Sequence, residues 1–235
     1  MLFDLRAGGR RRLVQVVYLS LAILLGGGLV LFGIGGDVSG GLFDAFREDS
    51  SQSNATQQLE ERLDEENEKL QANPNDPAAL AEKAKLHYQI AGAGENFNTD
   101  QGRFTAAGLA QLREAERAWN RYLATEPEEL NTGVAIQMVQ VFSTAGLNKP
   151  DEAVEAMELY IEERPPSSNL FAQLAQLSYL AGQDRKGDLA ADRAVELANE
   201  DDRRTLREQL DSVKTEALQA QAQQAATTPA PAPSG

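Results

Sequence analysis

The sequence contains no cysteine and only one histidine, His87. The absence of cysteine excludes a disulfide framework, a thiolate metal site, a cysteine nucleophile and a lipid-modified cysteine. A single histidine also argues against histidine-based catalysis and against a metal site built from several histidines. Aromatic residues make up only 6% of the chain, and such a composition favours helices over a sandwich of short strands.

Basic residues are also scarce, because 22 Lys and Arg face 36 Asp and Glu, which gives a net charge of -14. Nucleic-acid binding requires clustered Lys and Arg, so we expect no nucleic-acid partner. The sequence has no glycine-rich phosphate loop and no G-x-S-x-G motif. We therefore predict that the protein is not an enzyme, and that it has no catalytic residue, cofactor, metal site or small-molecule substrate.

The longest uncharged run is Leu13 to Ile34, near the N-terminus. A helix of this length spans about 30 Å, the thickness of the hydrocarbon core of a bilayer. Arginines precede the run and acidic residues follow it: Arg6, Arg10, Arg11 and Arg12, then Asp37 and Asp44. Because positive charge stays on the cytoplasmic side, this asymmetry predicts a cytoplasmic N-terminus.

We predict that residues 13–36 are a retained signal anchor that crosses the plasma (inner) membrane once. The alternative is a cleaved signal peptide, but its apolar region has roughly 7–15 residues and ends at a small-x-small site. Residues 1–12 would then be a basic cytoplasmic segment and 37–57 a flexible polar linker. The body, 58–218, reads as a helical domain outside the cytoplasm, and 219–235 as a disordered tail rich in Ala, Gln and Pro.

The body contains an internal repeat. The segment AERAWNRYLATEP matches AVEAMELYIEERP after a shift of 38 residues, and four pairs of positions correspond: Ala115 and Ala153, Trp119 and Met157, Tyr122 and Tyr160, Pro127 and Pro165. A weaker third copy places Gly187, Ala191 and Ala194 at the first three positions and Asn199 at the fourth. Small residues at the first position allow two helices to approach closely.

A helical run that ends in glycine precedes each copy, at Gly92, Gly146 and Gly182. The unit of helix, glycine turn, helix and late proline resembles the tetratricopeptide repeat over Pro74 to Asn199. The resemblance implies an all-α solenoid of about three hairpins, with capping helices at 59–71 and 201–218. The overall plan is similar to that of the membrane-anchored tetratricopeptide chaperones that accompany the bacterial Sec translocon.

The resemblance also implies a partner-binding groove lined by the first helix of each hairpin. Alignment on Gly146 and Gly182 matches Gln137 with Gln173, and amide side chains can hydrogen-bond a peptide backbone. The predicted groove residues are Gln137, Gln140, Ser143, Asn169, Gln173, Gln176 and Tyr179. The alternative is that these are ordinary solvated polar positions. The groove residues are mostly neutral amides, which argues against binding of a C-terminal carboxylate. Lys83 and Lys85 are the only basic candidates on the first of these helices.

The first hairpin carries an insertion of roughly 15 residues between Gly92 and Ala115, longer than a tight turn needs. Its residues 98–102 read as a turn, and Thr105 as the cap of the next helix. Three interpretations stay open: a structural turn, a loop that contacts a partner, and a calcium loop. The calcium loop is weakest, because Asp, Gly and Glu are missing from the positions that an EF-hand requires. His87 reads as a packing residue.

We therefore expect a bacterial, membrane-anchored, extracytoplasmic helical-repeat protein that binds other proteins or peptides. It would act as an interaction scaffold or as a chaperone-like factor for translocated or envelope proteins. The alternative is a structural subunit that assembles or stabilises one fixed membrane complex. Self-assembly through the short helix at 59–70 is a third interpretation, although two heptads are too few to predict a coiled coil.

Overall fold

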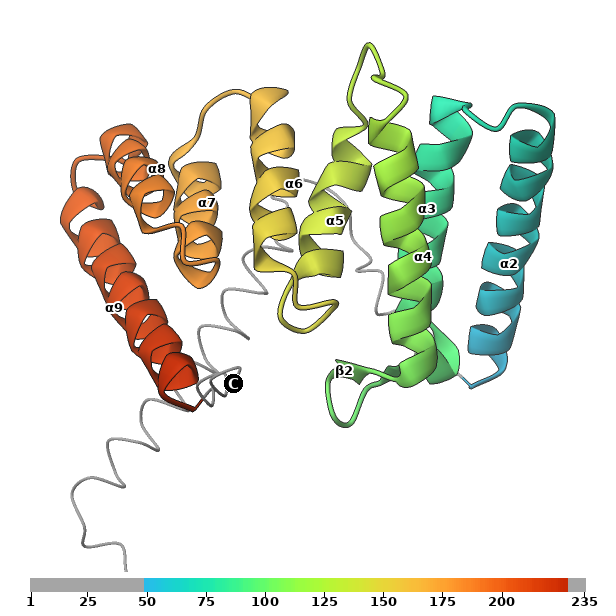
Figure 1. Ribbon diagram of the computed structural model, residues 1–235, viewed down its shortest axis with the longest axis horizontal. Helices are drawn as coiled ribbons and strands as arrows, with labels where there is room; N and C mark the ends of the chain where they lie inside the picture. Colours follow the sequence, from blue (N-terminus) through green and yellow to red (C-terminus); the bar gives the residue numbers. More distant parts are fainter. Residues whose placement is uncertain (1–48, 228–235) are drawn as a thin grey trace, which may run out of the picture. The chain divides into compact units, whose positions relative to one another are not determined.

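The computed structural model describes residues 49–227, and within this range the fold is all-α apart from one small β-hairpin. Eight α-helices follow one another in chain order, as Figure 1 shows: α2 (Asp49–Ala72), α3 (Pro77–Ala91), α4 (Ala106–Leu123), α5 (Thr132–Phe142), α6 (Pro150–Glu162), α7 (Ser168–Leu180), α8 (Asp184–Leu197) and α9 (Arg203–Thr227). This confirms the predicted all-α class.

The predicted anchor, 13–36, and the basic segment before it lie outside the described residues. Among the helices formed by residues 49–227, none combines the length and the apolar character that a membrane crossing requires.

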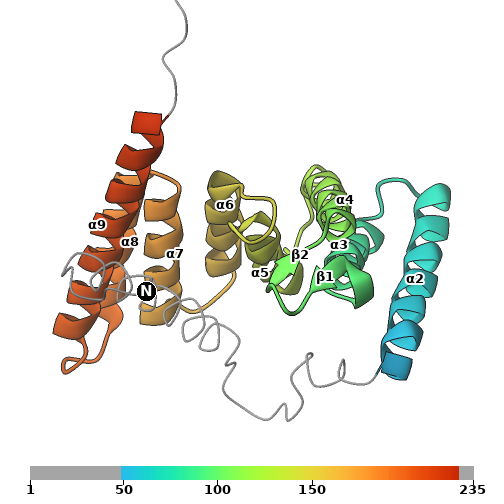
Figure 2. The ribbon, with the colours of Figure 1, turned by 90° about the horizontal axis from the view of Figure 1, so that it is seen from below.

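The helices pack as sequential hairpins. Helix α3 packs chiefly on α4, α5 on α6, and α7 on α8, while α2 covers α3 and α9 covers both α7 and α8. Figure 2 shows the same order from below, with α2 at one end of the row and α9 at the other. A row of helix pairs with a polar helix at each end is the arrangement expected of a helical repeat.

The residues that carry the sequence repeat lie in the core. Ala115, Ala153 and Gly187 are all buried, as the predicted close approach of paired helices requires. The large residues of the next position, Trp119 and Met157, are buried as well. Burial of these positions contributes the apolar surface that holds one hairpin to the next.

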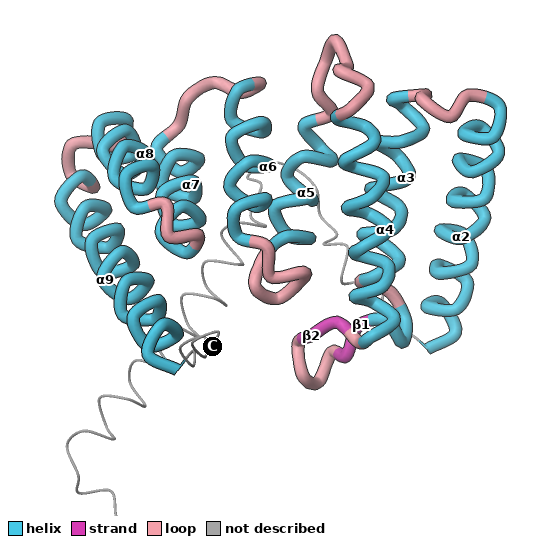
Figure 3. The backbone as a smooth tube through the Cα atoms, in the orientation of Figure 1, coloured by secondary structure: helices cyan, strands magenta, loops and turns pink. Residues whose placement is uncertain are grey.

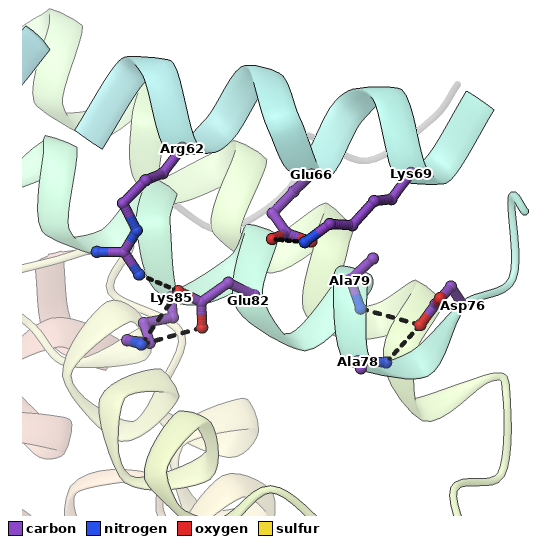
Figure 4. Close-up of polar contacts among 8 residues, drawn as sticks. All are labelled: Arg62, Glu66, Lys69, Asp76, Ala78, Ala79, Glu82 and Lys85. Atoms are coloured by element: carbon purple, nitrogen blue, oxygen red, sulfur yellow. Dashed lines mark hydrogen bonds and ion pairs between the residues drawn. The ribbon is translucent and has the colours of Figure 1, made fainter. Parts of the chain in front are cut away.

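The helices begin where the sequence places caps. The Asp76 carboxylate accepts hydrogen bonds from the backbone N–H groups of Ala78 (2.9 Å) and Ala79 (3.1 Å), and Pro77 occupies the first helical turn (Figure 4). Thr105 caps α4 by accepting from the N–H of Gly108 at 3.3 Å, as predicted. Such caps satisfy N–H groups that have no partner inside the helix.

Three helix ends differ from the prediction. Helix α2 begins at Asp49, inside the predicted linker 37–57, and α9 continues to Thr227, inside the predicted tail 219–235. Figure 3 shows both as continuous helices. Neither extension contains Gly or Pro, so nothing in it stops a helix. Helix α5 ends at Phe142, well before Gly146, where the backbone of Ser143 turns extended (ψ 167°) and its N–H and hydroxyl both donate to the Gln140 carbonyl, at 3.2 and 2.7 Å.

The insertion folds into a 3₁₀ turn, η2 (Gly94–Asn96), and a short antiparallel hairpin of β1 (Phe97–Asn98) and β2 (Arg103–Phe104). The Phe97 and Phe104 rings meet edge to face with centroids 5.1 Å apart. Asn98 Oδ1 accepts from the Gln101 N–H at 2.9 Å, which closes the turn. Asn96 and Asn98 of the insertion both form hydrogen bonds with backbone groups, which are the contacts of a structural turn.

Candidate functional site

The surface with the clearest binding potential is a polar stripe on α7. Asn169 is exposed, Gln173 and Gln176 are half-buried, and Leu180 ends the stripe with 51% of its surface exposed. These positions recur at intervals of three or four residues, so they share one helix face. Among the described residues, none of the three amide side chains has a hydrogen-bond partner. Each keeps both a donor and an acceptor for another molecule. We call these four residues the α7 stripe.

The predicted groove residues of α5 are less available. Gln140 is half-buried, and the Ser143 hydroxyl is occupied by the Gln140 carbonyl. Gln137 places its side-chain oxygen in the protein interior, where the described residues offer it no hydrogen-bond partner. A buried oxygen cannot accept a hydrogen bond from a peptide that approaches from solvent, although Gln137 as a whole is half-buried.

Tyr179 corrects the prediction most clearly. It is 1% exposed, and its hydroxyl donates to Asp188 Oδ1 of α8 at 2.9 Å. Lys214 of α9 donates to both oxygens of the same carboxylate, at 2.7 and 2.8 Å. Burial and the bond to Asp188 raise the pKa of the tyrosine, while Lys214 chiefly lowers the pKa of Asp188. Tyr179 therefore joins three helices and offers no surface to a partner.

The cause of this error is a register difference of one residue between α5 and α7. In burial, Phe142 corresponds to Tyr179 and Ala135 to Ala172, and each pair is 37 residues apart. Gly146 and Gly182, on which the predicted alignment rests, are 36 apart. The glycines are poor markers because seven residues separate α5 from α6, whereas three separate α7 from α8. At the offset of 37 residues, Gln137 corresponds to Leu174 and not to Gln173.

The basic residues of α3 are held by neighbours. Lys83 donates to Asn67 Oδ1 of α2 at 2.6 Å. Figure 4 shows that Lys85 donates to Glu82, which also accepts from Arg62. These contacts fix α2 against α3. Both lysines already donate hydrogen bonds, Lys83 to a neutral amide and Lys85 to a carboxylate, so a terminal carboxylate would have to compete with these partners.

A surface hollow of about 570 Å³ lies where α2, α3 and α4 meet. Its lining residues are Asp64, Asn67, Glu68, Leu70, Gln71, Lys83 and Arg121. Its lining includes two carboxylates and two cations. Arg121 already donates to the Pro74 carbonyl at 2.5 Å. This mixture of charges selects no class of small ligand.

His87 packs between α3 and α4, as the sequence predicted. It is 7% exposed, and its Nδ1 lies 2.7 Å from Gln111 Oε1. Because the amide oxygen accepts, the proton of the neutral ring lies on Nδ1. Burial lowers the pKa of the imidazole, and the hydrogen bond to Gln111 partly opposes this shift. In the part of the chain that the structure covers, no group of three His, Asp or Glu side chains is arranged to hold a metal ion.

Comparisons with protein-family models, with curated proteins and with solved structures found no match for this chain. The assignment of function therefore depends on the geometry of the helical body and on the residues that it presents.

Proposed function

We propose that this chain is a membrane-anchored protein whose tetratricopeptide-like domain binds segments of other proteins outside the cytoplasm. The observation that carries the proposal is the α7 stripe, where three neighbouring amides have no hydrogen-bond partner among the described residues. Amide side chains bond peptide groups through both donor and acceptor without demanding charge, so the stripe suits extended segments of varied sequence.

The tetratricopeptide-like character is supported by three hairpins in sequence and by the buried small residues Ala115, Ala153 and Gly187 at equivalent places. The anchor is supported by the uncharged run at 13–34 and by the arginines before it. The net charge of -14 keeps such a domain soluble and away from anionic headgroups. We accordingly propose a scaffold or chaperone-like role toward translocated or envelope proteins.

The test places a photo-crosslinking amino acid at Gln173 in the full chain, in its native membrane. The matched control carries it at Leu189, which is 63% exposed on α8 and outside the α7 stripe. We expect crosslinks to several exported proteins from Gln173 and not from Leu189. One stoichiometric membrane partner would instead support the fixed-complex alternative. Crosslinks to cytoplasmic proteins alone, or equal crosslinks from both sites, would contradict the proposal.

A further inference from the structure

The connection between α8 and α9 differs from the other connections between successive α-helices of the described chain. Each of the others contains glycine or proline, for example Pro74, Pro127 and Gly182. The α8–α9 connection, residues 198–202, reads Ala-Asn-Glu-Asp-Asp and contains neither. Glycine and proline are the residues that stop helices. No residue in this connection therefore prevents α8 from continuing into α9 as one helix.

A continuous helix would also gain favourable charge pairs. Glu200 lies four residues before Arg204, and Asp201 lies three before it. An acidic residue on the N-terminal side of a basic one at these spacings stabilises a helix. In the bent form, the turn is held by a backbone bond from the Asp202 N–H to the Asn199 carbonyl at 3.0 Å and by two side-chain bonds. The Asn199 amide donates to Asp202 Oδ2 at 3.3 Å, and the Arg203 side chain donates to the Ala198 carbonyl at 3.2 Å.

We call the surface of α7 and α8 that α9 covers the α9 seat, and it combines ion pairs with apolar contacts. Lys214 pairs with Asp188 at 2.7 Å and Arg207 with Asp192 at 2.6 Å, and all four side chains are partly exposed. Exposed ion pairs contribute little free energy and weaken in salt. Among the described side chains of α9, Leu210 and Ala217 are buried, and Leu206 and Val213 are half-buried against the core. The ion pairs and this apolar stripe together fix the position of α9, and an identical helix from a second copy would present the same groups.

We propose that residues 198–202 are a hinge, and that the seat of α9 accepts the α9 of a second copy of this chain. When the hinge straightens, α8 and α9 form one long helix that carries α9 away from its own seat. The α9 of a second copy fits the vacated seat through the same pairs, because an identical helix presents Arg207 to Asp192 and Lys214 to Asp188. Exchange is reciprocal, so both seats are filled and the dimer closes.

The absence of cysteine from the sequence provides a direct test. Full-length Asp188→Cys and Lys214→Cys chains are co-expressed in one membrane and treated with a short bis-maleimide. In one chain these positions face each other, so the double variant should crosslink within itself. We expect the two single variants to yield an interchain product that contains one chain of each kind. Neither single variant expressed alone should yield it.

The control pair acts on the hinge. Glu200 is the second residue of the Asn199–Asp202 turn, where proline fits, but proline prevents a continuous helix. Glu200→Pro should reduce the interchain product at least about tenfold, whereas Glu200→Ala, which favours the helix, should retain it. An interchain product unaffected by Glu200→Pro would overturn the hinge. A double variant that crosslinks while the mixed single variants do not would show that α9 stays on its own chain. If the double variant forms no crosslink, position 214 of α9 does not lie against position 188 of α8, and the proposal fails.

Discussion

The ring of Tyr179 lies directly on the backbone of Gly187, so that a β-carbon at this glycine would come within 2.4 Å of ring atoms Cδ1 and Cε1. The same ring is fixed from the other side, because its hydroxyl donates to Asp188 and the Lys214 ammonium lies 5.8 Å from its centroid. Gln221 of α9 adds a hydrogen bond to the Tyr179 carbonyl at 2.9 Å. The last hairpin and its covering helix therefore meet at one tyrosine.

This contact predicts that Gly187→Ala destabilises the domain. Alanine is worth about 1 kcal/mol more than glycine inside a helix, but the new methyl group cannot fit against a ring that is held in place. Overpacking of this kind costs about 1–3 kcal/mol, so we expect a net loss in chemical unfolding. Leu189→Ala, on the exposed face of the same helix, should change stability by less than about 0.5 kcal/mol. A Gly187→Ala protein more stable than the wild type would refute the close approach.

Truncation of Leu210 should lower stability more than truncation of any other described side chain of α9, because Leu210 is the large side chain that this part of the helix buries fully. Truncation to alanine removes buried methyl groups and leaves a cavity, at a typical cost of about 2–5 kcal/mol. We expect Leu210→Ala to raise amide hydrogen exchange throughout α9 before it affects α3 and α4. Uniform loss of protection across all helices would mean that α9 does not unfold separately.

His87 predicts a pH dependence between neutral and mildly acidic solution. Its folded-state pKa lies below the ordinary histidine value of 6.5 because burial penalises the charged ring. The unfolded chain then binds more protons at pH values between the two pKa values, so stability decreases as pH falls through about 6.5. The charges of Lys83, Glu114 and Arg117 also act on this ring, and Gln111 Oε1 accepts a hydrogen bond from its Nδ1.

His87 is the only histidine, so one imidazole signal in an NMR titration reports its pKa directly. Unfolding measured from pH 8 to pH 5 should show falling stability in the wild type and a flatter profile in His87→Gln. A folded-state pKa at or above that of a model peptide would contradict the sign of this prediction.

The proposed topology predicts opposite accessibility for the two ends of the chain. With no native cysteine, Ser234→Cys and Ala7→Cys each introduce a single label site. In cells whose outer membrane has been opened, a membrane-impermeant maleimide should label Ser234→Cys and leave Ala7→Cys unlabelled. The reverse pattern would place the helical domain in the cytoplasm and remove the basis for an envelope role.

The helical class was predictable because the apolar and small residues recur with helical spacing. Ala115 and Ala153 mark equivalent places in the sequence, and both are buried against a paired helix. Cap residues were equally informative, since Asp76 and Thr105 each bond N–H groups in the first turn of the following helix. These features act within one or two helical turns, so a sequence pattern can report them.

The site was predicted less well, because its geometry depends on the register between helices. Gly146 and Gly182 gave an offset of 36 residues between α5 and α7, but the buried positions correspond at an offset of 37. An error of one residue turns a side chain by about 100° around a helix. Asn169, Gln173 and Gln176 keep their place on the surface, whereas Tyr179 belongs to the core.

Because each described helix packs mainly on its neighbours in sequence, few contacts require distant parts of the chain to meet. Chains with such local contacts fold rapidly, and they can do so in steps. A hairpin such as α3–α4 can therefore form before α7 is available to the folding chain. Under the proposed topology, the domain folds progressively from its N-terminal side as the chain crosses the membrane, and it is complete only when α9 covers the last pair.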